Sequence, residues 1–280
     1  MNTKPARVLT IAGSAAGGSA GIQADLKTFQ EFQTYGMSVI TAIVSLHPET
    51  KKNVHPQTIE AIEAQFATAM RQVGTDVFKT GMLFSIEVIE RVAELIAETV
   101  QDEQLVVDPV MVGKLDSKLL EDDAIKALRD KLLPQATIMT PNMPEAEILL
   151  DGKRLESIQD LKQAAVDLHA LGSKYVLVKG GRLEGPAVDV LYDGKQLTLL
   201  EAPRIDTVNT SGAGCTYSAA IAALLAQGEA IETAVVEAKK YVTTAIEYGF
   251  SYTEHVGPTD HAAKRKYGHA HEIKVTHEPV

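Results

Sequence analysis

Residues 8–32, VLTIAGSAAGGSAGIQADLKTFQEF, contain a complete pattern of strand, loop and helix. Val8 to Ala12 is an apolar run with β-branched residues, which predicts a buried strand. It leads into the turn-forming segment GSAAGGSAG, after which Ile22, Leu26 and Phe29 recur at helical spacing. A strand joined to a helix through a glycine-rich loop is the repeating unit of a parallel sheet covered by helices.

The same alternation continues along the chain, and five strand patterns end in polar or glycine-rich turns followed by helices. The further predicted strands are Met37 to Val44, Val77 to Thr80, Leu105 to Asp108, Thr137 to Thr140 and Tyr175 to Val178. The predicted helices are Ile22 to Phe32, Pro56 to Val73, Ile86 to Val100, Asp122 to Leu133, Met143 to Leu150, Ile158 to Leu171, Cys215 to Leu225 and Ile231 to Tyr248. Two short strands between Ala187 and Leu200 flank a DG turn, which favours a hairpin. We therefore expect an α/β fold with a mostly parallel sheet, as one domain over residues 1–280.

Length, charge and cysteine content exclude several classes of protein. A chain of 280 residues that is 45% hydrophobic can bury the core of a single layered domain. The net charge of -10 argues against a surface that binds nucleic acid or an anionic membrane. The sequence shows no apolar signal segment and no run long enough to span a bilayer, and its one cysteine cannot form an internal disulfide. We therefore expect a cytoplasmic protein.

Residues suited to binding or catalysis gather at the predicted ends of strands. They are Gly13 to Gly21, His47, Gly81, Asp108, Asn142, Lys179 and Gly212 to Cys215. Because ligands of open parallel sheets bind at the carboxyl ends of the strands, we expect these residues to converge. Neither the mononucleotide loop G-x-x-x-x-G-K-[ST] nor the dinucleotide fingerprint is present, so a nucleotide would have to bind in another way.

The segment GAGC, residues 212–215, places the single cysteine at the start of a predicted helix. The amides of Gly212, Ala213 and Gly214 can bind a phosphate there, because a helix N-terminus carries partial positive charge. The same charge lowers the pKa of a thiol, which would make Cys215 a base beside that phosphate. Alternatively, Cys215 is a small apolar residue that packs at the helix start, and the glycines only form a tight turn.

Two further motifs each allow two interpretations. In TPNMPEAE, Asn142 and Glu145 follow a strand, where they can bind Mg²⁺ through water or cap the next helix. In VKGG, Lys179 can reach phosphate oxygens or remain solvated.

The tail from His255 to Val280 shows no clear periodicity and carries five of the eight histidines. His269 and His271 form an H-x-H pair that could bind a metal. Because no further cysteine accompanies them, a solvated or dimer-packing tail is the favoured interpretation.

Six motifs, in this order, resemble those of the ribokinase-like superfamily, and within it the hydroxymethylpyrimidine kinases and related pyridoxal kinases. They are IAGSAAGGSAGIQADLKTF, KTGML, VVDPVMVGK, TPNMPEAE, VKGG and DTVNTSGAGCTYSAA, which together span nearly the whole chain. The resemblance implies a three-layer α/β/α ribokinase-like fold with a mostly parallel central sheet and a small hairpin. It also implies ATP and Mg²⁺ as cofactors, a small-molecule substrate and a homodimer.

The resemblance further implies roles for individual residues. Cys215 matches the residue that removes the proton from the substrate hydroxyl, and the amides of Gly212, Ala213 and Gly214 would stabilise charge on the transferring phosphoryl group. ATP binding is implied for Asn142, Lys179, Gly180, Gly181, Asp189, Thr210, Gly214 and Lys239. Substrate binding is implied for Gly13, Ser14, Gly21, Asp25, Leu46, His47, Met82 and Val110, and Mg²⁺ binding for Asp108 and Glu145.

The segment after the second predicted strand bears on the choice of substrate. The pyrimidine kinases have Gln-Asn-Thr there, with the glutamine contacting the pyrimidine, whereas this chain has Leu46, His47 and Pro48. The pattern IVSLHPETKKNVHP is similar to that of pyridoxal kinases, so we expect pyridoxal, pyridoxine and pyridoxamine as substrates. Hydroxymethylpyrimidine or its phosphate is the alternative, in a dedicated or a bifunctional enzyme.

Three positions depart from the family pattern. Ala15 replaces an aspartate of the first loop, and Ser211 replaces a histidine found in many relatives. Gly113 stands where certain pyridoxal kinases carry a second cysteine that traps the substrate aldehyde, so we expect no covalent capture. A vitamin-binding or nucleotide-sensing protein that kept the fold without turnover is the non-enzymatic alternative. The residues that argue against it are Cys215, Lys179, Asp108 and Glu145.

Overall fold

A computed structural model describes residues 4–45, 49, 53–99, 104–112, 120–254, 256–269 and 271–280. Leu46, His47, Pro48 and Gly113, which carry part of the substrate prediction, lie outside the described residues. Within the described part of the chain, no helix has both the length and the apolar composition needed to cross a membrane.

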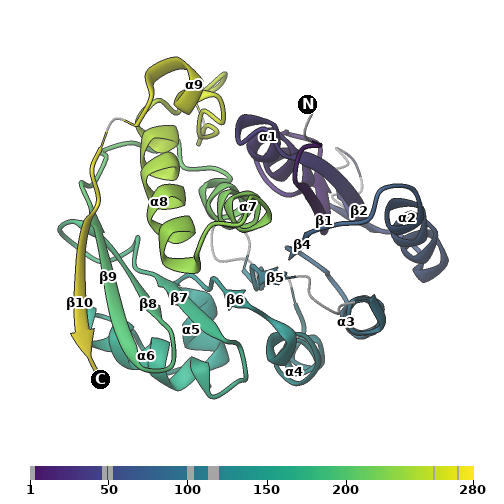
Figure 1. Cartoon of the computed structure of the whole chain (residues 1–280), viewed down its shortest axis with the longest axis horizontal. Coiled ribbons are helices and arrows are strands. Elements are labelled where there is room, and N and C mark those ends of the chain that lie inside the picture. Colours follow the sequence, from purple (N-terminus) through teal and green to yellow (C-terminus); the bar gives the residue numbers. More distant parts are fainter. Residues whose placement is uncertain are drawn as a thin grey trace.

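In the described ranges, ten strands form one sheet (Figure 1). They are β1 (Arg7–Ala15), β2 (Tyr35–Val44), β3 (Val54–Pro56), β4 (Val77–Thr80), β5 (Gln104–Val107), β6 (Ile138–Met139), β7 (Tyr175–Lys179), β8 (Ala187–Tyr192), β9 (Gln196–Ala202) and β10 (Lys274–Pro279). Their order is β10-β9-β8-β7-β6-β5-β4-β1-β2-β3. Neighbours from β7 to β2 are parallel, whereas β3 at one end and β8, β9 and β10 at the other join antiparallel.

Helices cover both faces of this sheet (Figure 1). One face carries α2 (Ile59–Gln72), α3 (Ile86–Thr99), α4 (Asp122–Ala127), α5 (Met143–Leu149) and α6 (Ile158–His169), and the other carries α1 (Ile22–Glu31), α7 (Ala213–Ala226) and α8 (Ile231–Glu247). Neighbouring strand residues enter opposite cores: Val8 and Val106 pack with α7 and α8, while Leu9 and Val107 pack on the other face. This alternation is expected of strands that are buried on both faces. The predicted three-layer α/β/α architecture and the β8–β9 hairpin are confirmed.

Two predicted boundaries were wrong. Pro56 does not start a helix but ends the edge strand β3, and α2 begins at Ile59 after Thr58, whose hydroxyl accepts from the amide of Ala61 (3.2 Å). Proline has no backbone N–H to donate to a neighbouring strand, so in a sheet it is found mainly on edge strands such as β3. The predicted helix from Asp122 to Leu133 is regular only to Ala127 and then continues as a π-helical turn and a 3₁₀ turn.

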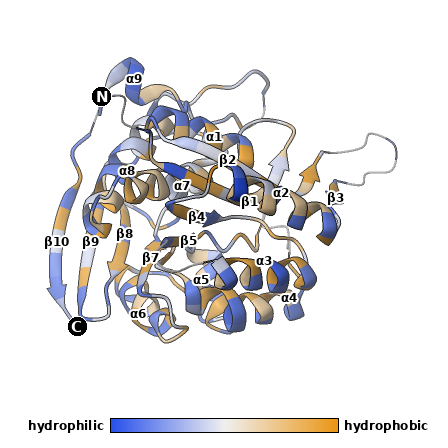
Figure 2. Ribbon diagram, turned by 45° about the vertical axis from the view of Figure 1, so that its right-hand side comes forward, coloured by the Kyte–Doolittle hydropathy of each residue, from blue (hydrophilic) through white to orange (hydrophobic). Residues whose placement is uncertain are grey.

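The C-terminal tail is more ordered than the sequence predicted. It contains α9 (Ala263–Tyr267) and β10, which pairs antiparallel with β9. Figure 2 shows β7 and β8 as largely hydrophobic and β10 as largely hydrophilic, as suits a strand at the exposed edge of a sheet. His269 and His271 contact two different glutamates of α8, Glu237 (3.5 Å) and Glu247 (3.0 Å), rather than one common point. The tail therefore packs against α8.

Candidate active site

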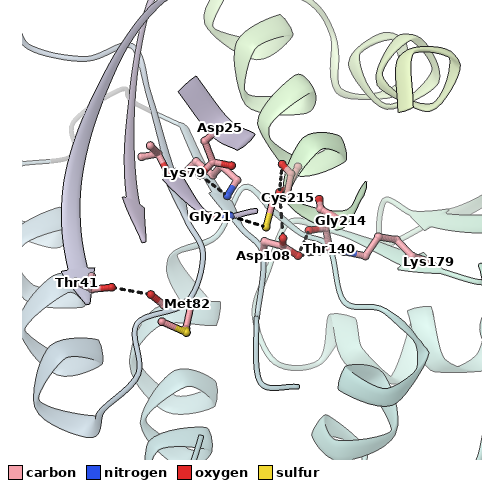
Figure 3. A network of polar contacts seen from close by, with 12 residues as sticks. Gly21, Asp25, Thr41, Lys79, Met82, Asp108, Thr140, Lys179, Gly214 and Cys215 are labelled. Carbon is pink, nitrogen blue, oxygen red and sulfur yellow. Dashed lines mark hydrogen bonds and ion pairs between the residues drawn. The ribbon is translucent and has the colours of Figure 1, made fainter. Parts of the chain in front are cut away.

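The predicted site residues converge at the carboxyl ends of the parallel strands. Figure 3 shows Asp25, Asp108, Lys179 and Cys215 around one region, although they come from α1, the end of β5, β7 and α7. Lys79 of β4, which was not among the predicted residues, lies there too. The convergence follows from the parallel sheet, because all of these strands point the same way.

The glycine loop after β1 lies directly against the start of α7. Gly212 has a φ of +84°, and a Cβ atom there would lie 1.6 Å from the carbonyl oxygen of Ser19. The hydroxyls of Ser19 and Ser211 are 2.8 Å apart, and the amide of Gly21 donates to Sγ of Cys215 (3.4 Å). Only glycine fits at position 212, both for its backbone conformation and for this close approach.

The amides at the start of α7 do not all point to a ligand. The amide of Ala213 donates to the carbonyl of Thr210 (3.1 Å), so it already has a partner within the turn. This corrects the expectation that Gly212, Ala213 and Gly214 present three unobstructed amides. Gly214 lines the cavity described below.

The thiol of Cys215 does not have the lowered pKa that its helix position predicted. Burial raises its pKa to about 11, and the positive charge of Lys79 offsets only part of this effect. The negative charges of Asp25 and Asp108 act in the same direction as burial. Cys215 is therefore a neutral thiol at pH 7, because the loss of solvation on burial outweighs the attraction of Lys79.

A buried ion pair lies beneath the thiol. Lys79 and Asp25 have no exposed side-chain surface, and Nζ lies 3.0 Å from Oδ2 (Figure 3). Oδ2 also accepts from the hydroxyl of Thr10 (2.6 Å), while Oδ1 has no hydrogen-bond partner among the described residues. Burial raises the pKa of Asp25, and for Lys79 the attraction of neighbouring anions outweighs burial and raises its pKa. Asp25 was predicted to bind substrate; its side chain is completely buried and paired with Lys79, and the substrate role stays a prediction.

Sequence reasoning assigned no role to Lys79. Lys79 begins the motif KTGML, so the sequence already indicated that it lies near the end of a strand. What the sequence did not reveal is its complete burial, which is rare for lysine unless a carboxylate pairs with it.

Asp108 forms a second polar cluster with Lys179. Nζ of Lys179 lies 3.0 Å from Oδ1 of Asp108. Oδ1 also accepts from the hydroxyl of Thr140 (3.1 Å), and Oδ2 accepts from the hydroxyl of Ser218 (3.1 Å). Burial opposes ionisation of Asp108, but the charges of Lys179 and Lys79 outweigh it and hold the pKa of Asp108 below its usual value. The cluster fixes the ammonium group of Lys179 at the end of β7.

Asn142 and Glu145 form a capping box at the start of α5. The amide of Glu145 donates to the side chain of Asn142 (3.0 Å), and the amide of Asn142 donates to the carboxylate of Glu145 (2.8 Å). Of the two interpretations of TPNMPEAE, the structure thus contains the helix cap. Burial also raises the pKa of Glu145 to about 7, with the negative charge of Asp108 adding to it.

A cavity of about 280 Å³ opens beside the start of α7. Six of the residues predicted to bind ATP line it: Lys179, Gly181, Asp189, Thr210, Gly214 and Lys239. The other two are adjacent, since Asn142 pairs with Lys179 as an isolated β-bridge and the amide of Gly180 donates to Asp189 (3.0 Å). Nζ of Lys239 lies 2.6 Å from Asp189, so a buried ion pair closes one side.

Several residues predicted to bind substrate also lie together. A Cβ at Gly13 would lie 2.6 Å from Cε of Met82, and a Cβ at Gly21 would lie 2.2 Å from the carbonyl of Gly13. Ser14 and Gly21 form an isolated β-bridge, and Val110 follows Asp108 by two residues. Gly13 therefore lies close to both Met82 and Gly21, and Gly21 contacts Cys215. Leu46 and His47 lie outside the described residues.

Comparison with known proteins identifies the family. Residues 16–260 match the family described as phosphomethylpyrimidine kinase. A pyridoxine kinase of Bacillus subtilis is 46% identical over 266 residues, covering 92% of this chain and 97% of that protein. A hydroxymethylpyrimidine/phosphomethylpyrimidine kinase of Streptomyces coelicolor is 45% identical over 257 residues, covering 92% and 94%.

Solved structures agree with this result. The pyridoxal kinase of Staphylococcus aureus, in complex with AMP-PCP and pyridoxal, has a TM-score of 0.91 and 39% identity and covers 99% of this chain and 100% of that one. An ADP complex of Bacillus subtilis pyridoxal kinase has a TM-score of 0.88 and 45% identity, covering 94% and 99%. The chain has the ribokinase-like fold of these enzymes and belongs to the phosphomethylpyrimidine kinase family.

Proposed function

We propose that this kinase transfers the γ-phosphoryl group of ATP to the hydroxymethyl group of pyridoxal, and also of pyridoxine and pyridoxamine. The observation that carries the phosphoryl transfer is the position of Cys215. It lies in the first turn of α7, beside Gly214, which lines the cavity, and within hydrogen-bond distance of Gly21 in the glycine loop. A substrate hydroxyl between the loop and the cavity would thus meet both a base and a phosphate.

In this proposal, ATP occupies the cavity that Lys179 and Gly214 line. Phosphoryl transfer depends on positioning and on neutralising charge, and the ammonium of Lys179 is held in place for both by Asp108. Cys215 accepts the proton of the substrate hydroxyl. Because burial raises its pKa, Cys215 is protonated at neutral pH and first releases that proton to water; the charge of Lys79 favours the thiolate that results.

The acidic residues of the site fit Mg²⁺, which binds proteins through one or two carboxylates and keeps several waters. Asp108 and Glu145 are both buried, and burial, with the negative charge of Asp108 adding to it, raises the pKa of Glu145. In the described part of the chain, no group of three acidic, histidine or cysteine side chains is placed to hold a metal. Bound Mg²⁺ would neutralise charge on the phosphates of ATP.

The choice of pyridoxal rests on Leu46. An aliphatic side chain cannot replace the hydrogen bonds that a glutamine makes to an aminopyrimidine, whereas it can pack on a pyridine ring. The pyridoxal and pyridoxine kinases among the relatives support this choice. A pyrimidine kinase of nearly equal identity, 45% against 46%, makes hydroxymethylpyrimidine the second candidate substrate.

The test is a coupled assay of ADP formation from ATP with pyridoxal, pyridoxine, pyridoxamine or hydroxymethylpyrimidine as acceptor. We expect the highest kcat/KM with pyridoxal. A higher kcat/KM with hydroxymethylpyrimidine would favour the second candidate, and no ADP formation with any acceptor would contradict both.

A further inference from the structure

One arginine holds the backbone of a loop beside the cavity. The loop, residues 181–186, is the part of the β7–β8 connection that follows Gly180, and both Gly181 and Arg204 line the cavity. Arg204 itself follows β9. Its guanidinium donates to four carbonyl oxygens of the loop: Nε to Gly185 (2.6 Å), Nη1 to Gly181 (2.8 Å), and Nη2 to Leu183 (2.5 Å) and Pro186 (3.5 Å).

These contacts engage most of the donors that an arginine has. A guanidinium carries five N–H groups, and four of them face the loop. An arginine that lines a nucleotide cavity commonly binds phosphate, because its fork of donors matches the oxygens. Here a phosphate would have to compete with existing hydrogen bonds to the loop. Arg204 is therefore placed to support protein backbone.

The loop needs such support. Four of its carbonyl oxygens accept from the same guanidinium, and five of its six residues are exposed, so without Arg204 water would have to replace these hydrogen bonds. Two of its six residues, Gly181 and Gly185, have no side chain to pack, and Leu183 is the residue that contacts the hydrophobic core. Without the guanidinium, the backbone of the loop would lose its common partner.

We infer that Arg204 is a positioning residue for the nucleotide: it holds residues 181–186 as a wall of the cavity and does not itself bind phosphate. This inference rests on the proposed function, because it takes ATP as the occupant of the cavity. It predicts that Arg204 acts on the part of the ligand that all adenine nucleotides share. Lys179, at the end of β7, would by contrast act on the phosphates.

Affinities for ATP, ADP and AMP, measured by calorimetry, separate these two roles. In Arg204→Gln we expect all three to fall by a similar factor, on the order of tenfold. The KM for ATP should rise while the KM for pyridoxal stays at its parent value. In Lys179→Met the loss should grow from AMP to ATP. Arg154→Gln is the matched control, because Arg154 is exposed and contacts only the carboxylate of Glu147 among the described residues.

Two results would overturn the inference. If the loss in Arg204→Gln grew with the number of phosphates, Arg204 would be a phosphate ligand, and if no affinity changed, the loop would not need it. A parent protein that binds none of the three nucleotides would contradict the proposed function itself. Amide hydrogen exchange without ligand gives an independent readout: the amides of residues 181–185 should exchange faster in Arg204→Gln, and unchanged exchange would also overturn the inference.

Discussion

The amide of Gly21 donates a hydrogen bond to the sulfur of Cys215 over 3.4 Å, between residues 194 positions apart in the chain. The contact joins the glycine loop after β1 to the first turn of α7, and the hydroxyls of Ser19 and Ser211 meet beside it. A donor that faces sulfur stabilises the thiolate more than the thiol. The fold therefore places Cys215 where a molecule bound against the loop would meet it.

The first prediction concerns the base. Cys215→Ala should lower kcat by a factor on the order of 10² to 10⁴, the range usual for loss of a general base. The affinity for ATP should remain, because alanine fits the space of the thiol. Cys215→Asp should retain more activity than Cys215→Ala, since a carboxylate can also accept the proton. Steady-state kinetics with pyridoxal and calorimetry with ATP provide the two measurements. Turnover of Cys215→Ala near the parent rate would make the thiol a packing residue.

The second prediction follows from the raised pKa of the thiol. Burial raises the pKa of Cys215 to about 11, above the value of 9.0 for a solvated thiol, so the thiolate is scarce at neutral pH. Alkylation by iodoacetamide should be slow at pH 7 and should accelerate up to about pH 11. Folded-state stability should fall over the same interval, from pH 9.0 upward, because the unfolded chain releases this proton first. A rate that levels off below pH 8 would show that the helix terminus dominates after all.

Much of the site could be predicted because its signals are local. Apolar runs that end in glycine or in a single polar residue, as at Gly13, Asp108 and Lys179, indicate strand ends whatever the rest of the chain does. A parallel sheet then brings those ends to one edge. The turn at Gly212 could also be predicted, because a glycine before a helix permits the positive φ that the structure has there.

The features that were missed depend on contacts between distant segments. Burial of Lys79 and the raised pKa of Cys215 arise where β4, α1 and α7 meet, and neither residue type nor spacing reports that burial. The strand β10 is likewise short and mostly polar, and it exists because β9 offers an edge. Sequence patterns indicate which residues face a core, but they do not measure how completely a charge is removed from water.

The third prediction tests the buried pair of Lys79 and Asp25. Lys79→Met or Asp25→Asn should each lower the free energy of unfolding by about 3 to 5 kcal/mol, because the remaining group stays buried without its partner. The double variant should recover much of that loss, since it buries no charge. Lys126→Met is the control: its pair with Asp130 is exposed, so about 1 kcal/mol or less is expected. Urea denaturation measures all four, and additive losses in the double variant would contradict the coupling.

The fourth prediction concerns substrate choice. Leu46→Gln should shift the ratio of kcat/KM values from pyridoxal toward hydroxymethylpyrimidine by roughly 10- to 100-fold, because the amide can satisfy the amino and ring nitrogen groups of the pyrimidine. Leu46→Met should keep the parent preference, since it changes the shape but not the polarity. The ratio is measured with both acceptors at saturating ATP. An unchanged ratio in Leu46→Gln would show that other residues select the ring.

The last prediction concerns the close approach at Gly212. In Gly212→Ala the new Cβ would lie 1.6 Å from the carbonyl oxygen of Ser19, and the φ of +84° would be strained for alanine. The start of α7 and the glycine loop must then separate, which removes the contact between Gly21 and Cys215. We expect the strained backbone alone to lower the free energy of unfolding by about 1 to 3 kcal/mol, and we expect a strong fall in kcat. Gly17→Ala is the matched control in the same loop, because among the described residues no atom beyond its chain neighbours lies within 4 Å of its added Cβ, and its φ is not positive. Thermal denaturation and kinetics compare the two variants, and an active Gly212→Ala of parent stability would show that the loop and the helix do not need this approach.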